Sequence, residues 1–120
     1  MLEQQLDRAM PNCTVRGSWQ DGIPVIAVTG EVDIGTAPLL RAELTSQLAQ
    51  SPVVLVVDLR EVTFFDSSGI GALLAAHRRT ADLRVVADRA PVLRTLHYAG
   101  MDTVFRVHPT LAAALAGLAR

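Results

Sequence analysis

Five consecutive apolar residues, Val53 to Val57, form a run that no polar side chain interrupts. Such a run predicts a strand that is covered on both faces or lies at the centre of a sheet, because a half-exposed strand would alternate apolar with polar residues. Asp66-Ser67-Ser68-Gly69 follows and favours the start of a helix, since aspartate and serine are good capping residues. A buried strand that leads into a helix is typical of an α/β sheet.

Strand and helix patterns alternate along the chain on both sides of this run. Asp21-Gly22 is a tight-turn dipeptide between two β-branched runs and predicts an N-terminal hairpin. Leu40, Leu44 and Leu48 recur every four residues and predict a helix whose first turn Thr36 is placed to cap. The expected order is ββαβαβα(β)α, with strands near residues 15–19, 25–28, 53–57, 83–87 and 104–107, and with helices after residue 33, over 67–80, over 90–100 and from 109.

These patterns predict a single-domain α/β fold with a mixed, mostly parallel sheet of four to five strands, an N-terminal hairpin and about four helices. The chain has 120 residues, half of them hydrophobic, which is enough for one core. Residues 1–12 are expected to form a short helix or a loose arm before the domain, which spans 13–120. The last helix is expected to begin at Pro109 and to bury three leucines, Leu111, Leu115 and Leu118.

Charge and hydropathy exclude several classes of protein. The formal net charge is -1, so the broad positive surface that nucleic-acid binding requires is missing. The N-terminus carries acids early and lacks the order of a secretory signal, and no apolar run approaches the roughly 20 residues needed to span a bilayer. We therefore expect a cytoplasmic protein without direct membrane insertion. Cys13, the only cysteine, is expected in a half-buried strand rather than as a reactive thiol.

The turn Asp66-Ser67-Ser68-Gly69 is the strongest candidate for a working site. It follows the predicted central strand, and the carboxyl ends of strands are where open α/β sheets usually meet ligands and partners. A phosphate on either serine would add roughly -1.5 to -2 charges beside Asp66, and we expect Glu31 and Asp33 nearby. A partner fitted to a neutral serine would reject that charge. Taken alone, the same four residues are also an ordinary helix cap, with Gly69 allowing close packing on the sheet.

Catalytic and metal sites find little support in the sequence. His77, His97 and His108 lack metal-ligand spacing, and no two of them stand at i and i+4 on one helix. Ser67 and Ser68 are outside a G-x-S-x-G frame, which disfavours a serine hydrolase. The chain contains no lysine, so it has no phosphate-binding G-x-x-x-x-G-K loop. We expect neither an enzyme nor a metal site.

Three segments of the sequence resemble one known family. The run from Val57 to Leu74, which contains Asp66-Ser67-Ser68-Gly69, closely resembles the signature of anti-sigma factor antagonists, members of the STAS domain family. Gly30-Glu31-Val32-Asp33 with Thr36 and Ala37 is similar to the family's second signature. The stretch from Val92 to Val107 is similar to its C-terminal pattern, with Leu96, Gly100 and Phe105. The resemblance covers about residues 14–118 and implies a STAS-like fold.

The resemblance also implies a phosphoserine switch. An anti-sigma factor that is itself a serine/threonine kinase would phosphorylate Ser68, with Ser67 as the alternative acceptor. The unphosphorylated protein would bind this kinase and release the sigma factor, and a phosphoserine phosphatase would reset the switch. The family has no metal or tightly held cofactor of its own. The implied partner-binding residues are Glu31, Asp33, Asp66, Ser67, Ser68, Gly69 and Ile70.

An alternative within the same family is a STAS subunit that serves as a docking piece in a membrane lipid-transport complex. That role needs no phosphate. Neighbouring genes would separate the two, since the first requires a small kinase and the second a transporter ATPase with a permease.

Overall fold

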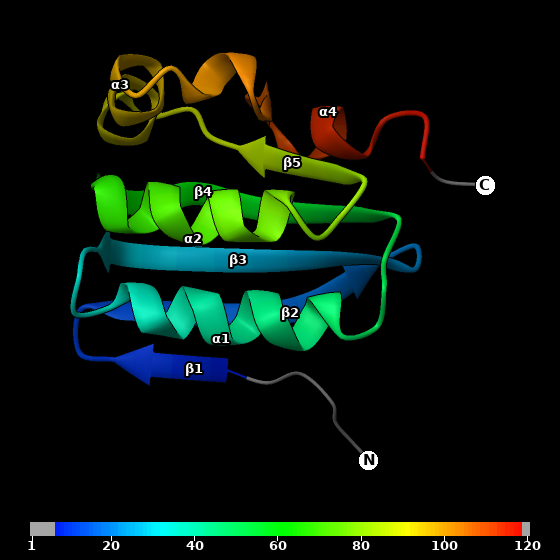
Figure 1. Cartoon of the computed structure of the whole chain (residues 1–120), viewed down its shortest axis with the longest axis horizontal. Coiled ribbons are helices and arrows are strands. Elements are labelled where there is room, and N and C mark those ends of the chain that lie inside the picture. The colour runs from blue at the N-terminus through cyan, green and yellow to red at the C-terminus, as the bar shows by residue number, and fades with distance from the viewer. Residues whose placement is uncertain (1–6, 119–120) are drawn as a thin grey trace.

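The computed structural model describes residues 7–118, which form one α/β domain built on a six-stranded mixed sheet (Figure 1). Strand order in the sheet follows chain order, with antiparallel pairing from β1 to β3 and parallel pairing from β3 to β6. The elements are β1 (Asp7–Met10), β2 (Cys13–Gln20), β3 (Ile23–Val32), α1 (Ala37–Leu48), β4 (Val54–Phe65), α2 (Ser67–His77), β5 (Asp82–Val86), α3 (Ala90–Tyr98), the 3₁₀ turn η1 (Met101–Thr103), β6 (Arg106–His108) and α4 (Leu111–Leu115).

The apolar run forms the centre of β4, as expected, and separates two cores. Leu55, Val56 and Val57 are completely buried. Because successive side chains of a strand point to opposite faces, Leu55 and Val57 join the larger core under α1, α2 and α3, whereas Val56 joins a smaller core closed by α4. Val53 lies before the strand and is 74% exposed, so the expected burial of the whole run was wrong at its first residue.

β4 is much longer than the apolar run and reaches the candidate turn without a loop. It continues to Phe65, although the sequence interpretation ended it near residue 57. Leu59, Val62 and Phe65 continue the buried face of the strand. Asp58 and Arg60 lie among them and pair with each other at 2.8 Å. These two charged residues therefore lie within the strand and do not end it.

The N-terminal end of the described chain departs from the expected helix or loose arm. Asp7–Met10 forms β1, which pairs antiparallel with β2 and supplies a sixth strand where four to five were expected. Pairing satisfies backbone groups that would otherwise be exposed at the edge of β2. Arg8 also forms an ion pair at 3.2 Å with Glu43 of α1, whose side chain is 1% exposed. Residues 1–6 of the expected arm lie outside the described residues.

The hairpin turn and the helices mostly follow their local signals. Asp21 and Gly22 have φ values of 52° and 80°, the left-handed pair that a tight hairpin turn requires. Gly100 ends the third helical segment with φ 73°, as expected. Buried leucines of α1 are those of the expected stripe, Leu40, Leu44 and Leu48.

The last helix is shorter than expected and starts later. α4 begins at Leu111 rather than at Pro109, because Thr110 caps it by accepting a hydrogen bond from the amide of Ala113 at 3.0 Å. Its buried residue is Ala114, whereas Leu111 and Leu115 are only partly buried against the smaller core. The helix ends at Leu115, so Leu118 lies beyond it. No helix within residues 7–118 combines the length and the apolar character needed to cross a membrane.

Cys13 is 3% exposed in β2, and burial raises the pKa of its thiol above the ordinary value of 9.0. A hydrogen bond with Thr36 opposes this rise and the charge of Asp33 adds to it. A thiol pKa that is higher in the folded than in the unfolded state leaves stability unchanged below about pH 9 and lowers it as the pH rises further. The parent should have a higher unfolding free energy than Cys13→Ala at pH 7, and this difference should become smaller between pH 7 and pH 10, as measured by urea titration. A difference that grows over this pH range would contradict the raised pKa of the Cys13 thiol.

Candidate functional site

Two loops that carry the candidate residues lie at one edge of the sheet. β3 and β4 are parallel neighbours, with Glu31 opposite Phe64 and Val32 opposite Phe65, so both strands end together. α1 and α2 begin at this same edge (Figure 1). The loop at Asp33 and the turn at Asp66 are therefore neighbours in space, although they are 33 residues apart in the sequence. This is the arrangement that the sequence interpretation expected.

The Asp66 turn is held in one geometry by three hydrogen bonds. Asp66 has an extended backbone, and its Oδ1 accepts from the amide of Ser68 at 2.9 Å. Its carbonyl oxygen accepts from the amides of Gly69 at 3.0 Å and Ile70 at 3.2 Å. The expected cap is confirmed. Because all three bonds use the backbone of α2, the two serine side chains are left out of the capping network.

Both serine hydroxyls lie in the first turn of α2, within reach of solvent. Ser67 is exposed and Ser68 is partly exposed. Within residues 7–118, neither hydroxyl has a hydrogen-bond partner. The positive end of the helix dipole favours an anion at this position. The geometry therefore leaves both hydroxyls accessible for modification, with Ser67 the more exposed of the two.

Gly69 and Ile70 lie behind the surface rather than on it. Ile70 is 7% exposed and belongs to the larger core. Gly69 is buried under the ring of Phe65, which would lie 2.4 Å from a Cβ placed on this glycine. These two residues shape the turn, whereas Asp66 and the serines form its outer face.

The close approach of Gly69 to Phe65 predicts a contrast between two neighbouring glycines. Gly69→Ala should lower the unfolding free energy by about 1–3 kcal/mol, because the ring of Phe65 is 3% exposed and has no free space to move into. A Cβ on Gly71 would meet only the end of the flexible Arg41 side chain, at 3.0 Å. Gly71→Ala should therefore be neutral or stabilising by up to about 1 kcal/mol, since alanine is the better helix former. Urea unfolding of the two variants measures the contrast, and equal effects would contradict it.

The Asp33 loop is organised by its own side chains. Asp33 Oδ1 accepts from the amides of Gly35 at 2.9 Å and Thr36 at 3.0 Å. The hydroxyl of Thr36 donates to the carbonyl of Glu31 at 2.7 Å and accepts from the amide of Asp33 at 3.0 Å. The expectation that Thr36 caps α1 with its side chain was wrong, because its hydroxyl turns back towards the end of β3. Asp33, not Thr36, connects this loop to the start of the helix.

The carboxylates of Glu31, Asp33 and Asp66 make this edge negative. Within residues 7–118, none of the three forms an ion pair with an arginine. Glu31 is exposed and accepts a hydrogen bond from Asn12 Nδ2 at 3.3 Å. A further negative group on a serine would therefore be added to an edge that already carries three carboxylates without an ion-pair partner among the described arginines.

Three residues at this edge were missed by the sequence interpretation. Thr95 of α3 donates its hydroxyl to the carbonyl of Phe65 at 2.8 Å and so fixes the end of β4 from a distance of 30 residues. Ile34 is 84% exposed and Phe64 is 48% exposed, so apolar surface lies beside the acidic groups. Phe64 had a detectable signal, because adjacent aromatic residues in a strand point to opposite faces. Thr95 had none.

Hydrolytic and metal chemistry gain nothing from the geometry of the described residues. No cluster of three or more histidine, cysteine, aspartate or glutamate side chains suited to a metal ion occurs within residues 7–118. His97 pairs with Asp102 at 2.8 Å on the surface, and His77 packs edge-on against Phe105. Among the described residues, none of the three histidines, His77, His97 and His108, forms a hydrogen bond with Ser67 or Ser68 that would activate a serine nucleophile.

Comparisons with known proteins agree on one family. Residues 18–114 match the STAS domain family. The chain is 33% identical over 113 residues to the anti-sigma-F factor antagonist RsfB of Mycobacterium tuberculosis, which covers 92% of this chain and 93% of RsfB. A crystal structure of an anti-sigma factor antagonist from Mycobacterium paratuberculosis is similar with a TM-score of 0.86 and 33% identity, covering 94% of this chain and 100% of that one. Bacillus SpoIIAA in its phosphorylated form has the same fold at 19% identity, with a TM-score of 0.63 over 84% of this chain and 96% of SpoIIAA.

Proposed function

The chain belongs to the STAS domain family, in which its relatives are anti-sigma factor antagonists, and we propose that it acts as a phosphorylation-gated antagonist of a kinase-type anti-sigma factor. In its unphosphorylated state it binds the anti-sigma factor at the edge formed by the Asp33 loop and the Asp66 turn, and the sigma factor is released. Phosphorylation of Ser68, with Ser67 as the alternative, ends this binding.

One observation carries the proposal: two accessible serine hydroxyls stand at the start of α2 beside three carboxylates that form no ion pair with a described arginine. The kinase brings ATP, whose γ-phosphoryl group passes to the serine oxygen as its bond to the β-phosphate breaks, and ADP and the hydroxyl proton are released. The product carries roughly -1.5 to -2 charges. A partner surface that fits the hydroxyl would have to bury this charge unpaired, which disfavours the complex.

The gating needs no large conformational change in this protein. Asp66 fixes the turn through backbone amides, so a phosphate on a serine oxygen leaves the cap bonds in place. The helix dipole favours the added charge from the protein's own side. The structure of Bacillus SpoIIAA in its phosphorylated form is consistent with a phosphate being tolerated by this fold.

The rest of the edge suits a protein partner. Ile34 and Phe64 offer apolar contact area, and the carboxylates of Glu31 and Asp33 offer acceptors for basic side chains of the anti-sigma factor. In this proposal the chain itself catalyses nothing and holds no cofactor, because ATP is bound by the kinase. It works in the cytoplasm, where a phosphoserine phosphatase removes the phosphate.

The test is intact-mass analysis of the protein purified from its own host, with the site mapped by fragmentation and bound proteins identified. We expect a population heavier by one phosphate on Ser68 or Ser67, and a kinase-type anti-sigma factor bound only to the unmodified form. A phosphate on any other residue would refute the site. Purification with a transporter ATPase and a permease instead of a kinase would refute the function.

A further inference from the structure

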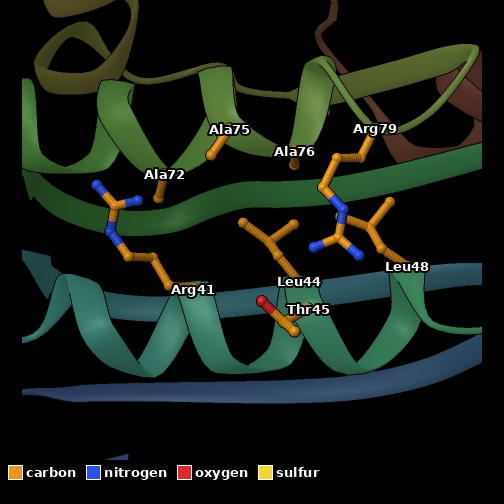
Figure 2. Close-up of a pocket in the computed structure, with 8 residues that line it drawn as sticks. All are labelled: Arg41, Leu44, Thr45, Leu48, Ala72, Ala75, Ala76 and Arg79. Carbon is orange, nitrogen blue, oxygen red and sulfur yellow. The ribbon is translucent and has the colours of Figure 1, made fainter.

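A groove runs between α1 and α2 on the outer surface of the helical layer (Figure 2). Leu44 and Leu48 of α1 line it from one side, and Ala72 and Ala76 of α2 line it from the other. Its volume is about 140 Å³. Small-molecule pockets usually measure roughly 300–1,000 Å³, so this groove suits a side chain of a partner rather than a metabolite.

Two arginines stand at the two ends of the groove. Figure 2 shows Arg41 reaching from α1 towards α2, and Arg79 reaching from the end of α2 towards α1. Within residues 7–118, neither guanidinium has a carboxylate within 4.0 Å. Most other described arginines do have an acidic partner: Arg8, Arg16, Arg60, Arg84, Arg89 and Arg106. The groove therefore combines an apolar floor with two positive charges that no described carboxylate pairs with.

The Arg41 end of the groove lies near the Asp66 turn. A Cβ on Gly71 would lie 3.0 Å from Arg41 Nη2, and Gly71 follows Ser68 by three residues, which is about one helical turn. Arg79 is eight residues further along the chain, so at 1.5 Å per residue the two ends of the groove are on the order of 10 Å apart. A partner that covers Ser68 extends into the groove if it continues along α2.

We propose that this groove holds an acidic segment of the same anti-sigma factor, with two carboxylates for Arg41 and Arg79 and one compact apolar side chain between them. This inference rests on the proposed function and adds a second contact to it. The two unpaired arginines favour an acidic segment as the occupant of the groove. The partner would present basic side chains to Glu31 and Asp33, and acidic side chains to the groove, one to three turns further along α2. This change of charge along the partner surface also fixes the orientation of the partner on the protein.

The experiment uses pairs of matched arginines and the anti-sigma kinase recovered with the parent protein. Arg79→Glu is compared with Arg78→Glu, its exposed neighbour outside the groove, and Arg41→Glu with Arg94→Glu on the exposed side of α3. Titration calorimetry should show affinities at least about tenfold weaker for Arg79→Glu and Arg41→Glu, and within about twofold of the parent for the controls, because reversal replaces attraction by repulsion. The affinity of Arg79→Glu should also depend less steeply on salt than that of the parent.

Each outcome separates this inference from the function on which it rests. Recovery of binding when an acidic residue of the kinase is changed to arginine opposite Arg79→Glu would establish the contact. If kinase binding is lost in Ser68→Glu but unchanged in both groove variants, the proposed groove contact is refuted and the proposed function is not. If the parent protein binds no kinase, both the groove contact and the proposed function are refuted. A parent dimer that becomes a monomer in the groove variants would show that a second copy occupies the groove, and would overturn the acidic partner.

Discussion

Ser68→Glu is expected to weaken binding to the anti-sigma kinase at least about a hundredfold, equivalent to roughly 2.7 kcal/mol, while Ser68→Ala binds like the parent and accepts no phosphate at this position. In the proposed complex, glutamate would place a charge where a neutral hydroxyl is buried. The carboxylates of Glu31, Asp33 and Asp66 lie at the same edge, so the new charge is added beside groups of the same sign that form no ion pair with a described arginine.

Ser67 provides the matched control, because it is the adjacent and more exposed hydroxyl of the same turn. Ser67→Glu should weaken binding less than Ser68→Glu if Ser68 is the gate. Surface plasmon resonance with immobilised kinase gives the affinities, and urea unfolding shows whether each variant is folded. A Ser68→Glu variant that folds and binds as tightly as the parent would disprove charge gating, and a larger effect at Ser67 would move the gate to that residue.

Gly30→Ala is expected to lower the unfolding free energy by about 3 kcal/mol or more, since it combines left-handed strain with a backbone clash. Gly30 has φ +92°, and a Cβ at this position would lie 2.2 Å from the carbonyl oxygen of Asn12. That same carbonyl accepts a hydrogen bond from the amide of Glu31 at 2.8 Å. Relieving the clash would move the end of β3, and with it the start of the Asp33 loop.

Gly22→Ala isolates the conformational part of this loss. Gly22 has φ +80°, and a Cβ there would meet nothing within 4 Å. We expect this control to lose only about 1 kcal/mol. Urea titrations of the two variants give the difference, which measures the contact with Asn12. Equal losses of unfolding free energy in the two variants would show that the end of β3 can shift to accommodate an extra methyl group at no further cost.

Local signals accounted for most of the fold and for the capped turn. The central strand, the hairpin at Asp21-Gly22, the helix cap at Asp66 and the left-handed Gly100 each depend on residues within a few positions of one another. Preferences of this range are readable in a single sequence, because the backbone conformation is decided by the side chains next to it. The same signals placed the two serines at the carboxyl end of the central strand.

Features that depend on distant contacts were not readable in this way. β1 was missed because its place beside β2 depends on pairing across the sheet and on the ion pair of Arg8 with Glu43, 35 residues away. The full length of β4 was missed because its later buried residues, Leu59, Val62 and Phe65, do not alternate with period two, and the pairing with β3 contains register shifts in this part. Thr36 looked like a cap, but its hydroxyl bonds to the end of β3 instead.

Taken alone, the sequence determined the order of most elements, the central strand and the capped serine turn, because short-range sterics and hydrogen bonding suffice for these. Only the tertiary structure decided which charges stand together. The register of β3 and β4 fixed the expected closeness of Glu31 and Asp33 to Asp66, and the packing of α1 on α2 set Arg41 and Arg79 at the two ends of one groove, which no sequence signal indicated. The physical reason is that an electrostatic surface depends on distances between side chains, and packing sets those distances between elements far apart in the chain.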